Sequence, residues 1–290
     1  CIETSHMCHK QCAHTLTYPS TLYGKEKEME TIISQWHGRG IERKALILIQ
    51  GEQGSGKTAM VNEAAHLLME EKGFILKTGP GDAACDVPYG MVIAAVAGLL
   101  RQIMTEPPER LDQWKRKITF ALGGNGRVIT EMIPELEKII GPQQEVVPLG
   151  VEESLNRFFF TFRQFLAVFC SARHPVAFFL DNLHCADSSN LDLLQSLCMD
   201  PVIGHLMIVG TYRNDQNGMP RRLSILLQAV KEIGIPALTM ELSPLTSEHV
   251  RRIIAFTVKR EDPAVDALAE VIRKKTGGNA YGVYQLLETA

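Results

Sequence analysis

Short apolar runs alternate along this chain with longer stretches of helix-type periodicity. Continuous apolar runs bounded by turn residues are typical of strands that are buried on both faces of a parallel sheet. Because helical stretches separate the runs, the pattern predicts an α/β fold with a central parallel sheet. The expected strands are 45–50, 74–77, 176–180, 205–212 and 237–242.

The helical stretches divide the chain into an α/β part and a purely helical part. Residues 21–242 form the predicted α/β domain, and residues 78–150 read as a helical insertion within it. Residues 243–290 lack a strand pattern and predict a small helical lid. Helices are expected near 57–71, 87–101, 109–121, 127–140, 152–172, 188–199, 220–233, 246–259, 263–275 and 279–289, and an amphipathic helix carries Met29, Ile32, Ile33 and Trp36.

The segment after the first strand matches the pattern G-x-x-x-x-G-K-[ST], and a helix follows it. This strand–loop–helix context is the one in which the motif cradles phosphates. We therefore predict a P-loop site for a nucleoside triphosphate. Its residues are Gly51, Glu52, Gln53, Gly54, Ser55, Gly56, Lys57, Thr58 and Ala59.

Each residue type in this loop meets a physical requirement of phosphate binding. Glycines at positions 51, 54 and 56 let the backbone curl, because glycine adopts positive φ values that residues with a side chain rarely adopt. The N–H groups then point inward and, with the positive end of the next helix, attract phosphate oxygens. We expect Lys57 to reach the β- and γ-phosphates and the Thr58 hydroxyl to ligate Mg²⁺.

Asp181 ends the apolar run at 176–180. An acid at that point is expected to hold the Mg²⁺ beside the phosphate loop, usually through water, which is the Walker B arrangement. A buried acid that caps a helix is the alternative.

The position after Asp181 is where many such ATPases carry a second acid that activates the attacking water, and here it is Asn182. A neutral amide orients water but does not accept its proton at neutral pH. Asp187 and Glu52 are the acids considered as substitutes. Slow hydrolysis, or none, is therefore expected.

Arg213 follows the apolar run at 205–212. An always-charged guanidinium at a strand end next to the acid-bearing strand is well suited to contact a γ-phosphate. A surface arginine at a strand end is the alternative.

Composition narrows the class of protein. A hydrophobic content of 45% and a charged content of 22% are ordinary for a soluble globular domain. The net charge of −3 argues against a nucleic-acid partner, and no apolar run reaches the roughly 18 residues that span a membrane. The odd count of seven cysteines, partly in apolar stretches, predicts reduced thiols and a cytoplasmic location.

Residues 1–20 show no periodicity and predict a flexible tail. They contain His6, Cys8, His9, Cys12 and His14. No second ligand pair stands at established zinc spacing, so we favour a tail over a metal site. The chain begins with Cys, and we expect it to be an excised piece of a longer protein.

Several segments resemble the ATPase module of STAND proteins within the AAA+ group. More narrowly, they resemble the module coupled to serine/threonine kinases and hybrid histidine kinases. Residues 22–28 are similar to the opening G-R-E-x-E motif of that family, with Lys25 in place of Arg. Residues 178–187 resemble F-L-D-D-L-Q-W-A-D, residues 210–215 resemble G-x-Y-R-D-N, and residues 276–281 resemble G-G-N-P-F with alanine in place of proline.

The resemblance implies a strand order of 5-1-4-3-2, with ATP or ADP and Mg²⁺ bound between the sheet and the lid. It places Gly24 and Lys25 against the adenine, and it implies a lid that changes angle with nucleotide state. Sensor and kinase-type domains would flank this segment in the same polypeptide. Whether copies of the chain form a homo-oligomer stays open.

Three functions compete at this point. The first is a regulatory ATP/ADP switch with slow or impaired hydrolysis, which we favour. The second is an actively hydrolysing AAA+ ATPase that remodels a macromolecular partner, and the third is a scaffold whose pocket is structural. A kinase acting on its own is disfavoured because the sequence has no H-R-D or D-F-G stretch.

Overall fold

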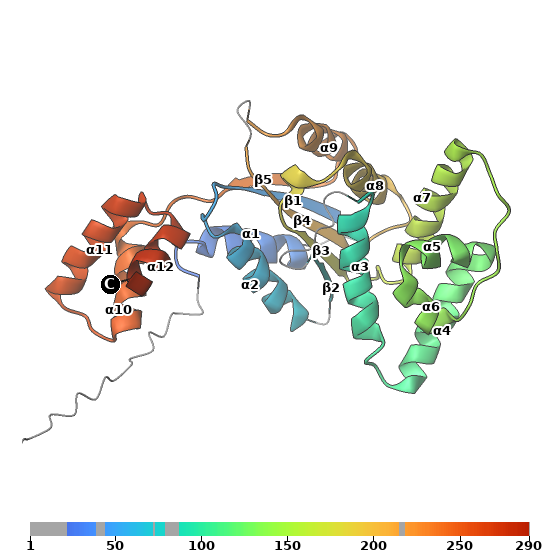
Figure 1. The fold of residues 1–290 in the computed structure, drawn as a ribbon, viewed down its shortest axis with the longest axis horizontal. Coiled ribbons are helices and arrows are strands. Elements are labelled where there is room, and N and C mark those ends of the chain that lie inside the picture. The colour runs from blue at the N-terminus through green and yellow to red at the C-terminus, as the bar shows by residue number, and fades with distance from the viewer. Residues whose placement is uncertain (1–21, 39–43, 72, 79–86, 215–217, 290) are drawn as a thin grey trace, which may run out of the picture. The chain divides into compact units, whose positions relative to one another are not determined.

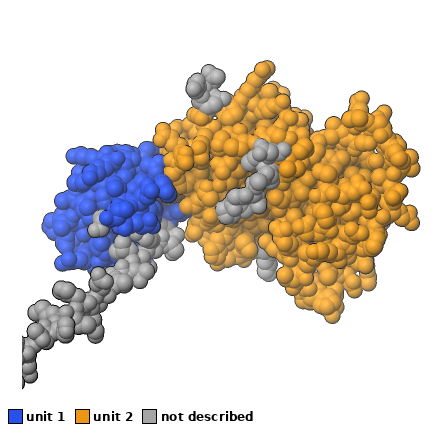
Figure 2. Space-filling view, in the orientation of Figure 1, with its two compact units in different colours: residues 1–24, 244–290 blue, residues 25–243 orange. Residues whose placement is uncertain are grey.

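The computed structural model describes residues 22–38, 44–71, 73–78, 87–214 and 218–289. The predicted tail at 1–20, with its cysteines and histidines, lies outside the described residues. The chain divides into two compact units, one of residues 25–243 and one of residues 1–24 with 244–290 (Figure 2). Among the described residues, no helix combines the length and the apolar character that crossing a membrane requires.

The larger unit is built on a five-stranded parallel sheet with the order β2-β3-β4-β1-β5. This is the order 5-1-4-3-2 read from the other edge, so the expected topology is confirmed. Every residue of β3 and β4 is buried, because central strands of a parallel sheet are covered on both faces. The strands are β1 Lys44–Gln50, β2 Phe74–Lys77, β3 Val176–Leu180, β4 Leu206–Tyr212 and β5 Ala237–Glu241.

Helices cover both faces of this sheet (Figure 1). On one face lie α1 (Glu26–His37) and α2 (Lys57–Met69), and on the other lie α8 (Ser188–Met199) and α9 (Arg221–Glu232). The helix α3 (Gly90–Ile103) packs against β2, β3 and α8. The central strands are therefore shielded from water, whereas the edge strand β5 has no buried residue.

The predicted insertion is helical, but one expected helix within it and one just after it have the wrong boundaries. The helix expected at 127–140 is broken at Ile133 (φ −131°, ψ 82°), because a residue before proline is pushed out of the helical region. The helix expected at 152–172 ends at Ala167, since Ser171 and His174 pair their backbones in a turn before β3. The elements are α4 Pro108–Leu122, α5 Gly126–Met132, α6 Glu137–Ile140 and α7 Val151–Ala167, with 3₁₀ turns at Gly123–Asn125 and Pro134–Leu136.

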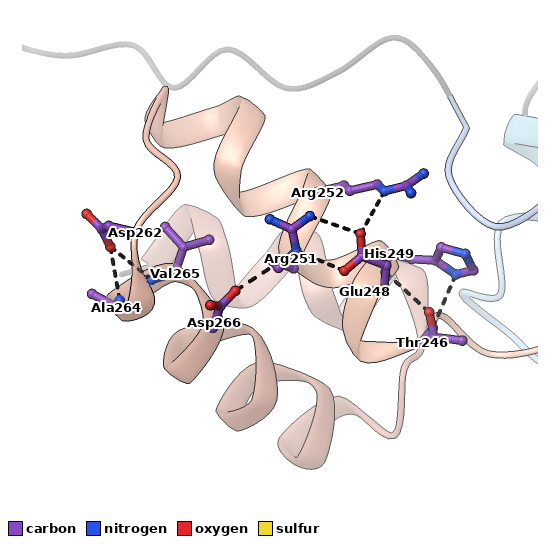
Figure 3. A network of polar contacts seen from close by, with 9 residues as sticks. All are labelled: Thr246, Glu248, His249, Arg251, Arg252, Asp262, Ala264, Val265 and Asp266. Carbon is purple, nitrogen blue, oxygen red and sulfur yellow. Dashed lines mark hydrogen bonds and ion pairs between the residues drawn. The ribbon is translucent and has the colours of Figure 1, made fainter.

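The smaller unit contains α10 (Ser247–Val258), α11 (Pro263–Thr276) and α12 (Ala280–Thr289) around its own apolar core. Figure 3 shows the polar contacts that order its helix ends. Thr246 and His249 form a capping box at the start of α10. Glu248 accepts hydrogen bonds from Arg251 and Arg252, which lower the pKa of its carboxyl group to about 2.

Candidate functional site

The loop between β1 and α2 has the backbone shape that its glycines predict, with one correction. Gly54 and Gly56 have φ values of +79° and +96°, a region that side chains rarely adopt. Gly51 does not have a positive φ. It is required for space instead, because a Cβ there would lie 2.5 Å from the Ser55 hydroxyl oxygen.

The Lys57 ammonium is folded over this loop. Its Nζ donates hydrogen bonds to the carbonyl oxygens of Gly51 (2.8 Å) and Glu52 (2.7 Å). Burial lowers the pKa of Lys57, the positive charge of Arg213 lowers it further, and Asp181 opposes both effects. The loop therefore holds one cation in place at the amino end of α2, where backbone N–H groups also concentrate positive potential.

The two predicted metal ligands lie side by side. Thr58 Oγ1 donates to Asp181 Oδ2 over 2.6 Å, and Thr211 Oγ1 donates to the other carboxylate oxygen. A carboxylate and a hydroxyl are hard oxygen ligands of the kind that Mg²⁺ prefers, and Mg²⁺ is usually bound by one or two carboxylates plus substrate phosphates. No group of three or more His, Cys, Asp or Glu side chains suited to a metal occurs among the described residues. Thr58 and Asp181 therefore fit a Mg²⁺ ion whose other ligands include phosphate oxygens, and they do not form a metal site from protein ligands alone.

Asn182 adopts the left-handed conformation (φ +62°, ψ 43°) that asparagine tolerates better than most residues. Its backbone N–H donates to the Thr211 hydroxyl at 2.9 Å and to Asp181 Oδ1 at 3.1 Å. These bonds lock the strand end that carries Asp181. The Asn182 side chain is therefore a neutral amide at the position directly after Asp181.

Helix capping in this region is performed by Asp187 and not by Asp181. The Asp187 carboxylate accepts hydrogen bonds from the N–H groups of Ser189 (3.3 Å) and Asn190 (3.0 Å) at the start of α8. Burial raises the pKa of Asp187, but these hydrogen bonds outweigh it and leave the pKa below its ordinary value. A carboxylate so engaged is a poor substitute for the missing second acid.

Arg213 reaches the phosphate loop from the end of β4. Its Nη1 donates to Gln53 Oε1 at 3.3 Å, which is possible because β4 is the neighbour of β1 in the sheet.

Four buried side-chain polar atoms lack a hydrogen-bond partner in the described part of the chain, and three of them belong to this site. They are Ser55 Oγ, His184 Nδ1 and Arg213 Nε. Buried polar groups are normally satisfied, and each exception calls for an explanation such as a water or ion. Their grouping around the phosphate loop fits a site that takes a polar ligand.

Three residues at this edge escaped the sequence reasoning: Thr78, His184 and Thr211. The Thr78 hydroxyl accepts from the Asp181 N–H at 3.2 Å, and Thr211 binds the Asp181 carboxylate. Burial, then Arg213 and Lys57, lowers the pKa of His184, with Asp181 opposing. The sequence did contain one signal for these residues, which is their position at or near strand ends. The carboxyl ends of parallel strands meet at one edge of the sheet, so polar residues there become neighbours.

Gly24 and Lys25 belong to different units, so their expected contact with adenine stays a prediction. Gly24 has a φ of +70°, and a Cβ there would lie 2.4 Å from Nδ1 of His249. Lys25 is buried, its ammonium donates to the Ser243 carbonyl, and burial lowers its pKa against the opposing charges of Glu28 and Glu26.

The remaining predicted site residues stay together in the loop and the first turn of α2. Glu52 and Gln53 are exposed and contribute the contacts described above, and Ala59 is exposed on α2. The residues from Gly51 to Ala59 thus include exposed and half-buried positions, whereas Lys57 is buried.

This chain is similar in sequence to a protein family and to a signalling protein. A family model described as the AAA ATPase domain matches residues 21–209. The hybrid signal transduction histidine kinase G of Dictyostelium discoideum is 35% identical over 176 residues, which are 61% of this chain and 5% of that protein. The chain therefore spans a small part of that relative, whose type agrees with the narrower resemblance drawn from the motifs.

Solved structures with a similar chain path include two archaeal proteins. Cdc6p from Pyrobaculum aerophilum has a TM-score of 0.49 and 13% identity, with 92% of this chain and 61% of that chain covered. A signal transduction ATPase with numerous domains (STAND) and a tetratricopeptide repeat sensor from Pyrococcus horikoshii has a TM-score of 0.46 and 13% identity, covering 91% of this chain and 29% of that chain.

Proposed function

The chain belongs to the AAA ATPase domain family, and from that membership we propose that it is an ATP-binding regulatory switch within a larger signalling protein. One observation carries the proposal. Lys57, Thr58 and Asp181, which are a cation and two hard oxygen ligands, converge at the carboxyl edge of the sheet beside a loop with inward-curling glycines.

The binding roles follow from the contacts of these residues. The loop N–H groups and the amino end of α2 would hold phosphate oxygens. Phosphate oxygens would replace the Gly51 and Glu52 carbonyls as acceptors for Lys57, because a charged acceptor makes the stronger hydrogen bond with an ammonium. Thr58 and Asp181 would hold Mg²⁺, which supplies charge neutralisation at the phosphates.

Slow hydrolysis is the part of the proposal that makes the site a switch. Attack on the γ-phosphate needs a group that orients water and takes its proton. Asn182 can only orient water, and Asp187 is engaged in capping α8. A bound triphosphate would therefore persist long enough to define a signalling state.

The switch also needs contacts that differ between ATP and ADP. Arg213 is suited to this because its present partner, Gln53, is neutral and lies in the phosphate loop. A γ-phosphate would be the stronger acceptor for the guanidinium. We propose that Arg213 leaves Gln53 for the γ-phosphate in the ATP state only.

The signalling context is supported by the relative in Dictyostelium discoideum, a hybrid signal transduction histidine kinase of which this chain matches 5%. We propose that sensor and kinase-type domains flank this chain in one cytoplasmic polypeptide.

The proposal is tested by titrating a fluorescent ATP analogue with Mg²⁺ into the wild-type chain and into Lys57→Ala. We expect the variant to lose roughly 10- to 100-fold in affinity, the value of a charge-assisted hydrogen bond. Lys138→Ala, on the exposed side of α6, is the matched control and should bind like the wild type. Unchanged affinity of Lys57→Ala would refute the site.

Turnover separates the switch from the alternative remodelling ATPase. Steady-state phosphate release is measured over a range of chain concentrations. We expect slow release that does not depend on concentration. Rapid phosphate release that increases with chain concentration would favour the remodelling ATPase over the switch. If the wild-type protein bound no nucleotide, the scaffold with a structural pocket would be the remaining function.

A further inference from the structure

A second cavity lies in the larger unit, away from the phosphate loop. It measures about 730 Å³, within the range of small-molecule sites. Gly73 and Phe74 at the start of β2 line it, as does His174 just before β3. Because β3 runs from this point to Asp181, the cavity stands at the amino edge of the sheet and the phosphate loop stands at the carboxyl edge.

Aromatic rings form the floor of this cavity. The rings of Phe74 and Trp114 meet edge to face with centroids 5.6 Å apart, and the centre of the His174 ring lies 5.6 Å from that of Phe74. Phe169, a core residue, packs against Trp114 at 5.3 Å. Because the core holds these rings, the floor is formed before any ligand arrives, which limits the entropy lost on binding.

Cationic side chains form the rim. Arg110, Lys117 and Arg173 line the cavity together with a single carboxylate, that of Glu106, which lies 3.9 Å from Arg110. Within the described ranges, neither Lys117 nor Arg173 forms an ion pair, and the Lys117 ammonium lies 4.8 Å from the centre of the Trp114 ring. Three cations against one acid in a hollow that aromatic side chains help to line concentrate positive potential.

We propose that this cavity binds a small aromatic anion. Its ring would lie on the floor made by Phe74 and Trp114, and its phosphate or carboxylate would be held by Arg173 and Lys117. The net charge of the whole chain is −3, so the positive potential is local to the cavity. That favours a small anion over an extended polyanion such as a nucleic acid.

The test uses the full chain and phenyl phosphate as the probe. Trp114 and Trp36 are the two tryptophans, so Trp36→Phe leaves Trp114 as the single reporter. We expect a saturable change in Trp114 emission with phenyl phosphate. Phenol, which lacks the charge, and inorganic phosphate, which lacks the ring, should each bind at least about tenfold more weakly, as loss of one charged or one stacking contact predicts.

Variants show which site the probe occupies. Arg173→Gln should weaken phenyl phosphate at least about tenfold, and Arg116→Gln, on the same helix as Trp114 but not lining the cavity, should not. Lys57→Ala should bind phenyl phosphate like the wild type, since the phosphate loop is not involved. Isothermal titration calorimetry of the otherwise wild-type chain provides the same affinities if Trp36→Phe folds poorly.

Besides the result for Lys57→Ala given below, three results would overturn the proposal. They are no saturable binding of phenyl phosphate, equal binding of phenol, and an affinity that Arg173→Gln leaves unchanged. Loss of probe binding in Lys57→Ala would assign the probe to the phosphate loop. That outcome would refute the second site and leave the proposed switch function intact.

Discussion

The Thr58 hydroxyl donates a 2.6 Å hydrogen bond to the Asp181 carboxylate across 123 residues of sequence. Neighbouring ligands of an octahedral Mg²⁺, each about 2.0–2.1 Å from the ion, lie about 2.9 Å from each other. The two oxygens are thus close to the spacing that a shared Mg²⁺ requires. We therefore propose that Thr58 and Asp181 hold Mg²⁺ together when a nucleotide is bound, in place of this hydrogen bond.

This pairing predicts how ATP affinity depends on Mg²⁺. In Thr58→Val the hydroxyl ligand is lost, so the gain in ATP affinity that Mg²⁺ brings should shrink at least about tenfold. Losses of this size are usual when a residue that supports a bound metal is replaced. Thr58→Ser keeps the hydroxyl and is the matched control. The measurement is ATP titration by calorimetry with Mg²⁺ and with a chelator, and an equal Mg²⁺ effect in Thr58→Val and Thr58→Ser would count against the assignment.

Asn182→Asp should speed hydrolysis. The substitution supplies a proton acceptor at the position next to Asp181, and general-base catalysis commonly contributes about 10²- to 10⁴-fold. Aspartate also tolerates the φ of +62° at this position, so the fold should be kept. We expect phosphate release to rise at least about tenfold.

The control for that experiment is Asn125→Asp, which adds a carboxylate before α5, far along the chain from the site. It should leave the rate of phosphate release unchanged. If Asn182→Asp releases phosphate no faster than this control, the missing acid is not what limits turnover.

Gly277 and Gly278, which precede α12, should be destabilised by alanine for two different reasons, backbone conformation and lack of space. Gly277 has a φ of +63° with open space around it, so Gly277→Ala should destabilise by about 1–2 kcal/mol, the cost of a left-handed residue. Gly278 has a φ of +79°, and a Cβ there would lie 2.4 Å from the Leu245 carbonyl oxygen. Gly278→Ala should therefore cost more than Gly277→Ala.

Urea unfolding of both variants measures this difference in the free energy of unfolding. The Leu245 N–H donates to the Gly278 carbonyl at 2.8 Å, so the backbone cannot withdraw without losing that hydrogen bond. Equal destabilisation by the two alanines would show that the close approach is relieved at no cost.

His184 should make stability depend on pH. Burial, then Arg213 and Lys57, lowers the pKa of His184 in the folded chain, whereas the unfolded value is about 6.5. Between the two values the unfolded state binds more protons, so stability rises with pH and falls as pH drops through about 6.5. His184→Gln should flatten this dependence between about pH 7 and pH 5.

Urea unfolding at several pH values measures the effect, and His66→Gln on the exposed side of α2 is the comparison. The prediction fails if His184→Gln and the wild type lose the same free energy of unfolding over that range.

Helix boundaries illustrate how far local sequence reasoning reached. The helix expected near 188–199 is α8 (Ser188–Met199), and its start can be read from the sequence because its cap, Asp187, depends only on the next three residues. The end of α7 was placed five residues beyond Ala167. The apolar pattern continues through Phe169, but the chain turns there to begin β3, and a turn set by packing leaves no trace in helical periodicity.

The phosphate loop, the acid at Asp181 and the parallel α/β fold can all be read from the amino-acid sequence. Each of these depends on consecutive residues or on a repeating pattern, so neighbours along the chain suffice to define it. Folding is needed to show that Thr211 and Thr78 bind Asp181, that Arg213 meets Gln53, and that an aromatic, cation-rimmed cavity opens at the opposite edge. Those contacts join strands and helices distant in sequence, and they exist because the order of strands and the packing of the core bring them together.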